Sequence, residues 1–425
     1  MSPLTHIMAT VFSKKDFIAT KWFTLEKLIQ LITGVYIVPQ IFSSLGPIDI
    51  GKLKFVESVL GMFTPLFFLG LPAICIREIV FKPKRSEQIL ATAFYLRLLS
   101  WMLLFIGVLV YFKTIENSPL TSLYIIISLS YLLKLTDVFE YYLLAKKWTK
   151  IIFISKITTL IIIVALQYYG VKNHLDVNYF AKLIVVDVLI QGLIYFLILN
   201  TIKQFSFKKW TFSWPLGKSL LKMSFPLIIS NSLIMFYITI DELFLKHFLG
   251  DHANGIFATV QFLVIALSWN IGFSIINALY PSLAESFQKD HKLYTKKIIK
   301  LLKIMLFLGL SIGVLYTFLG HLILTHYFTE NYIEAQTPLL IFCWAPLFIF
   351  IGMIYEKHLI NSNDLQKNVY RFVIGCIANV ILCYLLIPIW HVTGAAIAVL
   401  ASHFITNILY VFLDRKSRIQ LLSLF

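Results

Sequence analysis

Long apolar runs recur along the whole of this 425-residue chain. A helix needs roughly twenty apolar residues to span the hydrocarbon core of a bilayer, and about twelve runs of that length are present. Hydrophobic residues make up 59% of the chain and charged residues only 14%, more apolar surface than one soluble core could enclose. The sequence therefore predicts an all-α polytopic membrane protein. The expected spans are 25–43, 55–76, 89–112, 119–144, 151–170, 178–200, 223–245, 256–280, 300–324, 338–359, 370–390 and 394–413.

Basic residues are concentrated in every second connection between these spans. The formal charge of +16 would suit a nucleic-acid partner, but the positive-inside rule explains it by topology and by anionic lipid headgroups. The rule predicts that both termini are cytoplasmic and that the first span is a retained helix. The predicted inner residues are Lys14, Lys15, Lys21, Arg77, Lys82, Lys84, Arg85, Lys146, Lys147, Lys150, Lys203, Lys208, Lys209, Lys218, Lys222, the lysines of 289–303, Lys357, Lys367, Arg371, Arg415, Lys416 and Arg418. The outer residues are Lys52, Lys54, Lys113, Lys172 and Lys246.

Two similar turns stand between apolar runs. Leu45–Lys52 contains Gly46 and Gly51 at P-loop spacing, but Leu53 stands where a magnesium-binding Ser or Thr is needed, and no strand precedes it. The pattern Leu-Gly followed four residues later by Gly returns at Leu249–Gly255 without a lysine. The sequence thus favours a repeated turn over a nucleotide site.

The longest polar connection, residues 203–222, divides the spans into two sets of six. We expect an N-terminal six-helix bundle at 1–202, a cytoplasmic connecting loop at 203–222 and a C-terminal six-helix bundle at 223–425. Because six is even, the halves have the same orientation, as in parallel repeats. Each Leu-Gly turn then lies on the outer side between the first two spans of its half. This arrangement predicts two related bundles around a central cavity.

Charged residues at membrane depth are the candidate site, because they are costly unless they face a cavity or a partner. Lys134 lies twelve residues before Lys146, about 18 Å at helical rise, and shares one helical face with Asp137 and Glu140. A local Lys134–Asp137 pair is the simplest interpretation. The alternative is that Lys134 and Arg97 line the cavity and bind an anionic substrate group.

Other charges have competing interpretations. Arg77 either belongs to the positive-inside pattern or guards the inner mouth of the cavity. Asp137, Asp187 and Asp241 are candidates for cavity acids or for coupling to H⁺ or Na⁺, although Asp241 with Glu242 could equally be a solvated helix end. Three lysines near span ends are expected to snorkel to the interface, and three asparagines within spans are expected to form interhelical hydrogen bonds. The anchors are Lys27, Lys156 and Lys182, and the hydrogen-bonding residues are Asn231, Asn277 and Asn379.

No catalytic or metal-binding residues and no resident cofactor are predicted. The four cysteines, Cys75, Cys343, Cys376 and Cys383, all fall within spans and lack C-x-x-C spacing. Zinc-protease and serine-hydrolase motifs are missing, and no predicted outer loop is long enough to build an active site.

Short motifs distributed over the chain resemble the Wzx-type flippases of O-antigen and other polysaccharide repeat units. The likeness departs from the family at Trp390–Thr393, where a shorter glycine-containing turn is more usual. The motifs are Trp22–Lys27, Leu45–Gly51, Phe55–Ser58, Leu69–Leu71, Arg77–Glu78, Phe225–Leu227, Ile240–Asp241, Leu249–Gly255, Tyr280–Leu283, Ile387–Pro388 and Gly394–Ala396.

The resemblance implies the fold of the MOP superfamily, which includes MATE exporters and the lipid II flippase. It implies a bacterial inner-membrane protein that moves undecaprenyl-diphosphate-linked oligosaccharide to the outer leaflet by alternating access, for O-antigen (lipopolysaccharide) or another surface polysaccharide. A polysaccharide polymerase and a chain-length regulator are the partners that this role suggests. The alternatives are a MATE-like ion-coupled drug exporter and, less favoured, a membrane-embedded polymerase or glycosyltransferase.

Overall fold

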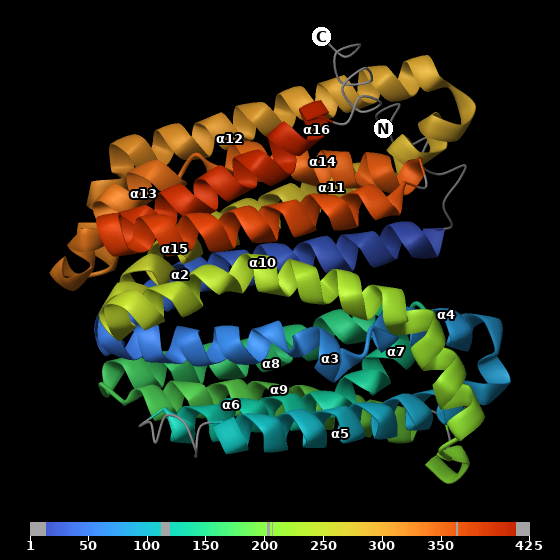
Figure 1. Cartoon of the computed structure of the whole chain (residues 1–425). Coiled ribbons are helices and arrows are strands. Elements are labelled where there is room, and N and C mark those ends of the chain that lie inside the picture. The colour runs from blue at the N-terminus through green and yellow to red at the C-terminus, as the bar shows by residue number, and fades with distance from the viewer. Residues whose placement is uncertain (1–13, 112–119, 202–204, 206, 363, 414–425) are drawn as a thin grey trace. The chain divides into compact units, whose positions relative to one another are not determined.

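The computed structural model describes residues 14–111, 120–201, 205, 207–362 and 364–413. Every regular element in these ranges is helical (Figure 1). Lys113, Lys203, Arg415, Lys416 and Arg418, which carry part of the predicted charge asymmetry, lie outside them. The elements are α2 (Lys14–Met62), α3 (Thr64–Phe68), α4 (Leu71–Phe81), η1 (Pro83–Arg85), α5 (Ser86–Tyr111), α6 (Thr121–Leu133), η3 (Lys134–Asp137), α7 (Val138–Ala145), α8 (Thr149–Lys172), α9 (Val177–Thr201), η4 (Phe207–Lys209), α10 (Trp214–Gln261), η5 (Phe262–Ala266), α11 (Leu267–Lys289), α12 (His291–Tyr327), η6 (Glu330–Ala335), α13 (Gln336–Phe342), α14 (Ala345–Asn361), α15 (Leu365–Phe404), η7 (Ile405–Leu409) and α16 (Tyr410–Leu413).

Ten helices in the described part of the chain are long and apolar enough to cross a membrane, or eleven if Glu330–Phe342 and Ala345–Asn361, bent by 50°, form one span. The polytopic helical class is thereby confirmed. The sequence predicts about twelve spans, and the difference arises at Gln366–Leu413, a stretch of 48 residues. Its length of roughly 72 Å exceeds twice a hydrocarbon core of roughly 30 Å. Its backbone breaks at His391 (φ 52°), between two of the predicted spans.

The described residues divide into two compact units. Unit 1 contains those of Met1–Ile37 and Val56–Met235, and unit 2 those of Val38–Phe55 and Phe236–Phe425. The units therefore divide both α2 and α10. The division into six-helix halves at 203–222 stays a prediction.

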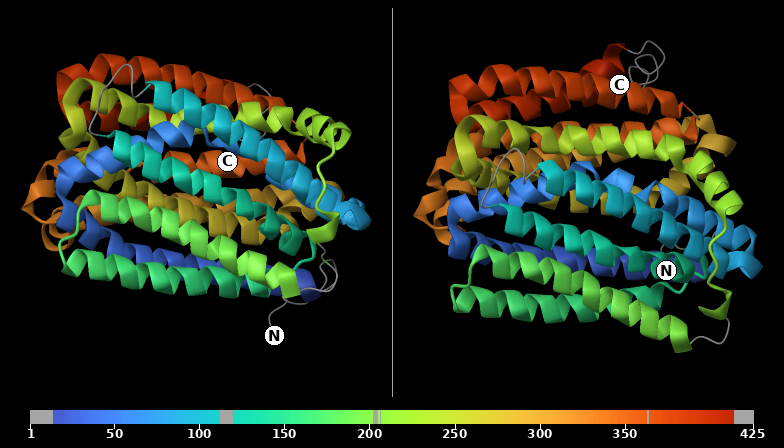
Figure 2. Two further views of the ribbon diagram at one scale, coloured as in Figure 1. Left: turned by 90° about the horizontal axis from the view of Figure 1, so that it is seen from below. Right: turned by 60° about the horizontal axis from the view of Figure 1, so that its bottom comes forward.

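In unit 1, α9 packs against both α6 and α8, and α4 packs against α7 (Figure 2). An aromatic core joins these helices to the polar connection. The ring of Trp210 lies 6.0 Å from that of Phe94 and 5.8 Å from that of Phe139, while Phe205 lies 5.2 Å from Tyr142. The described residues of the connection therefore pack on unit 1, because their aromatic rings contact those of its helices.

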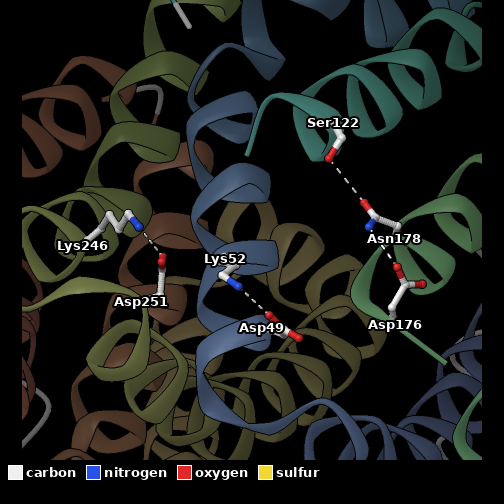
Figure 3. A network of polar contacts seen from close by, with 7 residues as sticks. All are labelled: Asp49, Lys52, Ser122, Asp176, Asn178, Lys246 and Asp251. Carbon is white, nitrogen blue, oxygen red and sulfur yellow. Dashed lines mark hydrogen bonds and ion pairs between the residues drawn. The ribbon is translucent and has the colours of Figure 1, made fainter. Parts of the chain in front are cut away.

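The turn between α8 and α9 is held by a small polar network (Figure 3). The amide of Asn178 and the backbone N–H of Tyr179 both donate to the Asp176 carboxylate, at 3.0 and 3.1 Å. Asp176 therefore caps the first turn of α9. The hydrogen bond from Asn178 lowers the pKa of Asp176 below its usual range, so the cap keeps its negative charge at neutral pH.

Unit 2 is built from α11 to α15 with η6 and η7, and α12 packs closely on α14 (Figure 1). Glycines permit this approach, since a Cβ on Gly309 would lie 3.0 Å from Leu347 and one on Gly313 would lie 2.7 Å from Trp344. Such small-residue contacts are typical of helices that associate inside a membrane. Two π-helical turns, η5 and η7, interrupt the helices of this unit.

Candidate functional site

The candidate site of unit 1 is centred on a break in a helix. The sequence predicts one continuous span at 119–144, but α6 ends at Leu133 and residues Lys134–Asp137 form the 3₁₀ turn η3. The hydroxyl of Thr136 donates to the carbonyl of Leu133 at 2.7 Å, a local bond that competes with α-helical pairing. Because residues i and i+3 are eclipsed in a 3₁₀ turn, Lys134 and Asp137 lie on the same side of it.

A glycine on the neighbouring helix allows this turn to pack closely. α9 contacts η3, and a Cβ on Gly192 would overlap the side chain of Thr136. Gly192 therefore allows η3 to approach α9 more closely than any larger residue would. The sequence contains this glycine, but its function depends on a contact between segments far apart in the chain.

Arg97 of α5 is buried, and both of its terminal nitrogens are hydrogen-bonded to the protein. Its side chain is 2% exposed, and its two terminal nitrogens donate to the hydroxyl of Tyr141 at 3.0 Å and to the backbone carbonyl of Lys134 at 2.7 Å. The guanidinium also lies 3.9 Å from the carboxylate of Asp137 and 4.5 Å from the ring centroid of Phe68. Arg97 thus holds the backbone of η3 and lies near its acid, and its side chain is buried away from any ligand.

Lys134 is the more available cation. It is half-buried, and its ammonium lies 4.8 Å from the ring centroid of Tyr131. Within the described ranges, no carboxylate oxygen lies within the 4.0 Å ion-pair distance of this ammonium. Asp137 and the exposed Asp187 of α9 interact with it electrostatically over longer distances. The direct Lys134–Asp137 pair expected as the simplest interpretation is therefore wrong.

A second charge network lies in unit 1. Lys156 of α8 pairs with Glu140 at 2.9 Å and with Glu26 at 3.8 Å. Glu26 is 2% exposed and also lies 3.9 Å from Lys27, whose ammonium donates to Gln30 at 2.9 Å. The prediction that Lys156 snorkels to the interface is wrong, because two carboxylates from other helices hold it in the protein interior.

The structure does not bring Arg77 to this cluster. Its side chain is 48% exposed near the end of α4 and contacts Glu78 at 3.2 Å and the sulfur of Met223 at 3.0 Å. Lys82 pairs with the other oxygen of Glu78 at 2.8 Å. These contacts form a local charge cluster at a helix end.

Asp241 belongs to unit 2 and is 1% exposed, while its neighbour Glu242 is 6% exposed. The interpretation of this pair as a solvated helix end is wrong. The amide of Gln261 donates to Asp241 at 2.6 Å. One turn earlier, the hydroxyl of Tyr237 lies 2.9 Å from the imidazole of His403, and Asn379 donates to the Tyr237 carbonyl at 3.2 Å. The last contact confirms Asn379 as an interhelical hydrogen-bonding residue.

Sequence reasoning missed the aromatic partners of this chemistry. Tyr141 and Tyr131 look like ordinary apolar-span residues, and only their contacts with Arg97 and Lys134 distinguish them. The one available signal was that each lies within one or two helical turns of a buried charge. In the described part of the chain, no group of three or more His, Cys, Asp or Glu side chains is arranged to hold a metal ion.

Several solved transporter structures share this fold. An inward-facing multidrug resistance MATE transporter of the MOP superfamily has a TM-score of 0.73 at 12% identity, over 94% of this chain and 98% of that one. The lipid II flippase MurJ in an inward closed conformation has a TM-score of 0.72 at 15% identity, over 95% and 91%. A MOP superfamily transporter from Pyrococcus furiosus has a TM-score of 0.66 at 12% identity, over 96% of each chain. The chain therefore has the fold of MOP-superfamily transporters.

The chain belongs to the polysaccharide biosynthesis protein family, which matches residues 17–287. The capsular polysaccharide biosynthesis protein CapF of Staphylococcus aureus is 26% identical over 200 residues. That match covers 47% of this chain and 50% of CapF, so the chain aligns with half the length of this relative.

Proposed function

We propose that this protein is a flippase that moves oligosaccharide repeat units, linked to undecaprenyl diphosphate, from the inner to the outer leaflet of the cytoplasmic membrane. Its membership of a polysaccharide biosynthesis family and its MOP-superfamily fold support transport of a glycan intermediate. Two halves that rock against each other around a central cavity would provide alternating access. We further propose that both termini are cytoplasmic and that a polymerase and a chain-length regulator act on the product.

The observation that carries this proposal is Lys134. An ammonium at membrane depth with no carboxylate of the described residues in ion-pair contact is costly, and a transient anionic ligand would offset that cost. A diphosphate supplies such a ligand, because its oxygens accept strong charge-assisted hydrogen bonds. In this proposal Lys134 binds the diphosphate, and Arg97 positions the backbone of η3. Arg77 attracts the anionic group at the inner mouth of the path.

We propose that the acidic residues couple transport to an ion. Asp137 and Asp187 interact electrostatically with Lys134, so a proton or Na⁺ on either acid would change the charge that the substrate meets. Asp241, buried beside the Gln261 amide, is the corresponding candidate in unit 2. A MATE-like drug exporter shares the fold, but the prominent membrane lysine favours an anionic substrate.

A strain lacking this protein tests the function directly. Labelled lipid-linked repeat units should accumulate on the cytoplasmic leaflet of the deletion strain and return to normal when the intact gene is restored. Leaflet position is measured by accessibility to a membrane-impermeant glycan-modifying enzyme in right-side-out and inverted vesicles. Normal surface glycan together with altered drug resistance would contradict the flippase and favour the exporter.

A further inference from the structure

The polar connection and α5 form an apolar cavity on the surface of unit 1. The cavity has a volume of about 300 Å³ and is lined by Tyr95, Leu96 and Leu99 of α5 and by Phe212 and Trp214 of the connection. The ring of Phe212 stands edge-on to that of Tyr95, with 6.1 Å between centroids, and lies 6.3 Å from the ring of Trp214. All of these side chains except that of Leu96 are exposed. An exposed apolar patch of this kind marks a surface that contacts a membrane or a partner.

Two contacts fix the connection against α5. The backbone N–H of Ser213 donates to the hydroxyl of Thr92 at 3.3 Å. A Cβ on Gly217 would lie 3.3 Å from the side chain of Thr92 and 3.4 Å from that of Leu96, so this glycine lets the first turn of α10 lie directly on α5. The cavity is therefore held in shape by the protein on both of its walls.

Basic side chains accompany the cavity along the connection. Lys208 and Lys209 belong to η4, which packs on α5. Lys218 and Lys222 follow Trp214 by four and eight positions, so they share its face of α10. All four lysines are exposed, and no carboxylate of the described residues pairs with any of them. Their charge is thus available to an anionic group next to the apolar cavity.

The apolar surface continues from the cavity along α5. Met102, Leu103 and Ile106 are exposed, and together with Tyr95 and Leu99 they recur at helical spacing. They therefore form one stripe on α5. The segment Pro83–Gly107 is long and apolar enough to cross a membrane. A long apolar chain that occupies the cavity can follow this stripe into the hydrocarbon core.

We propose that this surface binds one anionic phospholipid, with the phosphate at the lysines of the connection and an acyl chain in the cavity and along α5. The lipid site consists of Tyr95, Leu99, Phe212 and Trp214 with Lys208, Lys209, Lys218 and Lys222.

The chemistry of the lipid site fits both ends of such a molecule. Ammonium groups donate charge-assisted hydrogen bonds to phosphate oxygens, and aromatic rings such as Trp214 favour the level of the headgroups. A soluble anion would leave the apolar cavity empty, and a neutral lipid would leave the four lysines without a counter-charge. Phospholipids surround every membrane-spanning helix, so this occupant requires no further component. The inference is independent of the substrate that the protein moves.

Titration of the purified protein with phosphatidylglycerol in a neutral detergent tests the charged half of the lipid site, with bound lipid counted by native mass spectrometry. The charge variant combines Lys208→Gln, Lys209→Gln, Lys218→Gln and Lys222→Gln. Its Kd for phosphatidylglycerol should be at least roughly tenfold higher than that of the unmodified protein, because each basic residue near an anionic headgroup contributes to binding. Arginine at the same four positions keeps the charge and should keep the affinity.

Four exposed lysines of α12 provide the matched control for charge. The control variant combines Lys292→Gln, Lys296→Gln, Lys300→Gln and Lys303→Gln. It removes the same charge from unit 2 and should leave the Kd unchanged. Equal weakening by the two glutamine variants would overturn the lipid site, because it would indicate a general effect of net charge. Unchanged binding by the charge variant would overturn it as well.

A second pair of variants tests the apolar half. Leu99→Trp fills the cavity and should also raise the Kd for phosphatidylglycerol at least roughly tenfold. Leu193→Trp on α9 is the control, since Leu193 is 51% exposed and Leu99 54%, but only Leu99 lines the cavity. Equal affinity of these two variants would show that no acyl chain occupies the cavity.

The choice of lipid identifies the occupant. Phosphatidylglycerol with a photoreactive acyl chain should label peptides that contain residues 95–99 or 212–214, and labelling confined to other peptides would reject the location. Phosphatidylcholine should bind at least roughly tenfold more weakly, since it lacks a net negative charge. Equal binding of phosphatidylcholine would reject the function of the lysines. Binding of undecaprenyl phosphate without binding of phosphatidylglycerol would reject the phospholipid and assign the cavity to a polyprenyl carrier.

Discussion

Two cations at membrane depth in unit 1 have different surroundings. Arg97 donates to Tyr141 and to the Lys134 carbonyl, it lies near Asp137, and its side chain is buried in the protein. Among the described residues, Lys134 has the ring of Tyr131 at 4.8 Å and acids at longer distances. Both were predicted as substrate ligands from the sequence. The geometry favours Lys134 as the ligand and Arg97 as the residue that positions it.

Replacing Lys134 tests that distinction. Lys134→Ala should lower flipping at least roughly tenfold, because a hydrogen bond to a charged group contributes about 1.5–3 kcal/mol. Lys134→Arg should retain most of the activity, since it keeps a cation at that depth. The rate is measured in vesicles containing equal amounts of each variant. Lys182→Ala, an exposed lysine of α9, serves as the control. Unchanged flipping by Lys134→Ala would reject Lys134 as a ligand.

Arg97 should instead affect stability. Arg97→Leu leaves the carbonyl of Lys134 without its donor and the half-buried carboxylate of Asp137 without its nearest cation, and an unsatisfied buried polar group costs about 1–3 kcal/mol. Tyr141→Phe removes a single hydrogen bond and should cost about 1 kcal/mol. Thermal unfolding in detergent measures both. A melting temperature for Arg97→Leu equal to that of the unmodified protein would show that the network is not structural.

The sequence predicts how deep a charged residue lies in the membrane better than it predicts which residues that charge contacts. Hydropathy and helical rise locate Lys134 near mid-membrane without any structure. They cannot predict that Arg97 binds Tyr141, 44 positions away, or that Lys156 is held by Glu26 and Glu140. Those contacts depend on which helices are neighbours and on their rotation. Neither property is encoded in the local pattern of apolar residues.

At the scale of elements, η3 is the feature that organises the site. In a continuous α-helix Asp137 would stand about 60° around the axis from Lys134, whereas the 3₁₀ turn aligns the two more closely. The turn is stabilised by the bond from Thr136 to Leu133 and by the close approach of Gly192. The spans themselves follow from hydropathy and the break at His391 falls between two predicted spans, but the break at η3 was not predicted. The break at His391 lies between Pro388 and Gly394, whereas η3 falls inside a predicted span and contains neither proline nor glycine.

Gly192 should be sensitive to the smallest enlargement. Gly192→Ala overlaps Thr136, and overpacking of this kind costs about 1–3 kcal/mol. Thr136→Ala removes the overlapping hydroxyl and methyl groups, so the double variant should be more stable than the sum of the two single effects predicts. Thermal unfolding of the unmodified protein, the two single variants and the double variant gives the coupling free energy between the two positions. Additive effects would mean that α9 and η3 do not meet at this pair.

At the scale of the whole chain, the two Leu-Gly turns connect sequence to architecture. Their spacing suggests two parallel halves, and in the structure Gly51 and Gly255 each lie against a backbone carbonyl of the other turn, as an approximate twofold axis between the turns would produce. The sequence could predict the repeat because glycine is required at the positive-φ positions Gly46 and Gly250. It could not predict that the repeated turns meet. A six-plus-six topology nevertheless requires that α15 cross the membrane twice.

Cysteine accessibility in intact cells tests that crossing. His391 breaks the Gln366–Leu413 stretch and is exposed, so His391→Cys should react with a membrane-impermeant maleimide from outside, as Lys172→Cys should. Asp364→Cys and Lys150→Cys should react only after permeabilisation, because the positive-inside rule places them in the cytoplasm. The native cysteines are all buried and contribute little background. Labelling of His391→Cys and Asp364→Cys from the same face would show that the segment between them does not cross the bilayer. The six-plus-six arrangement would then be wrong.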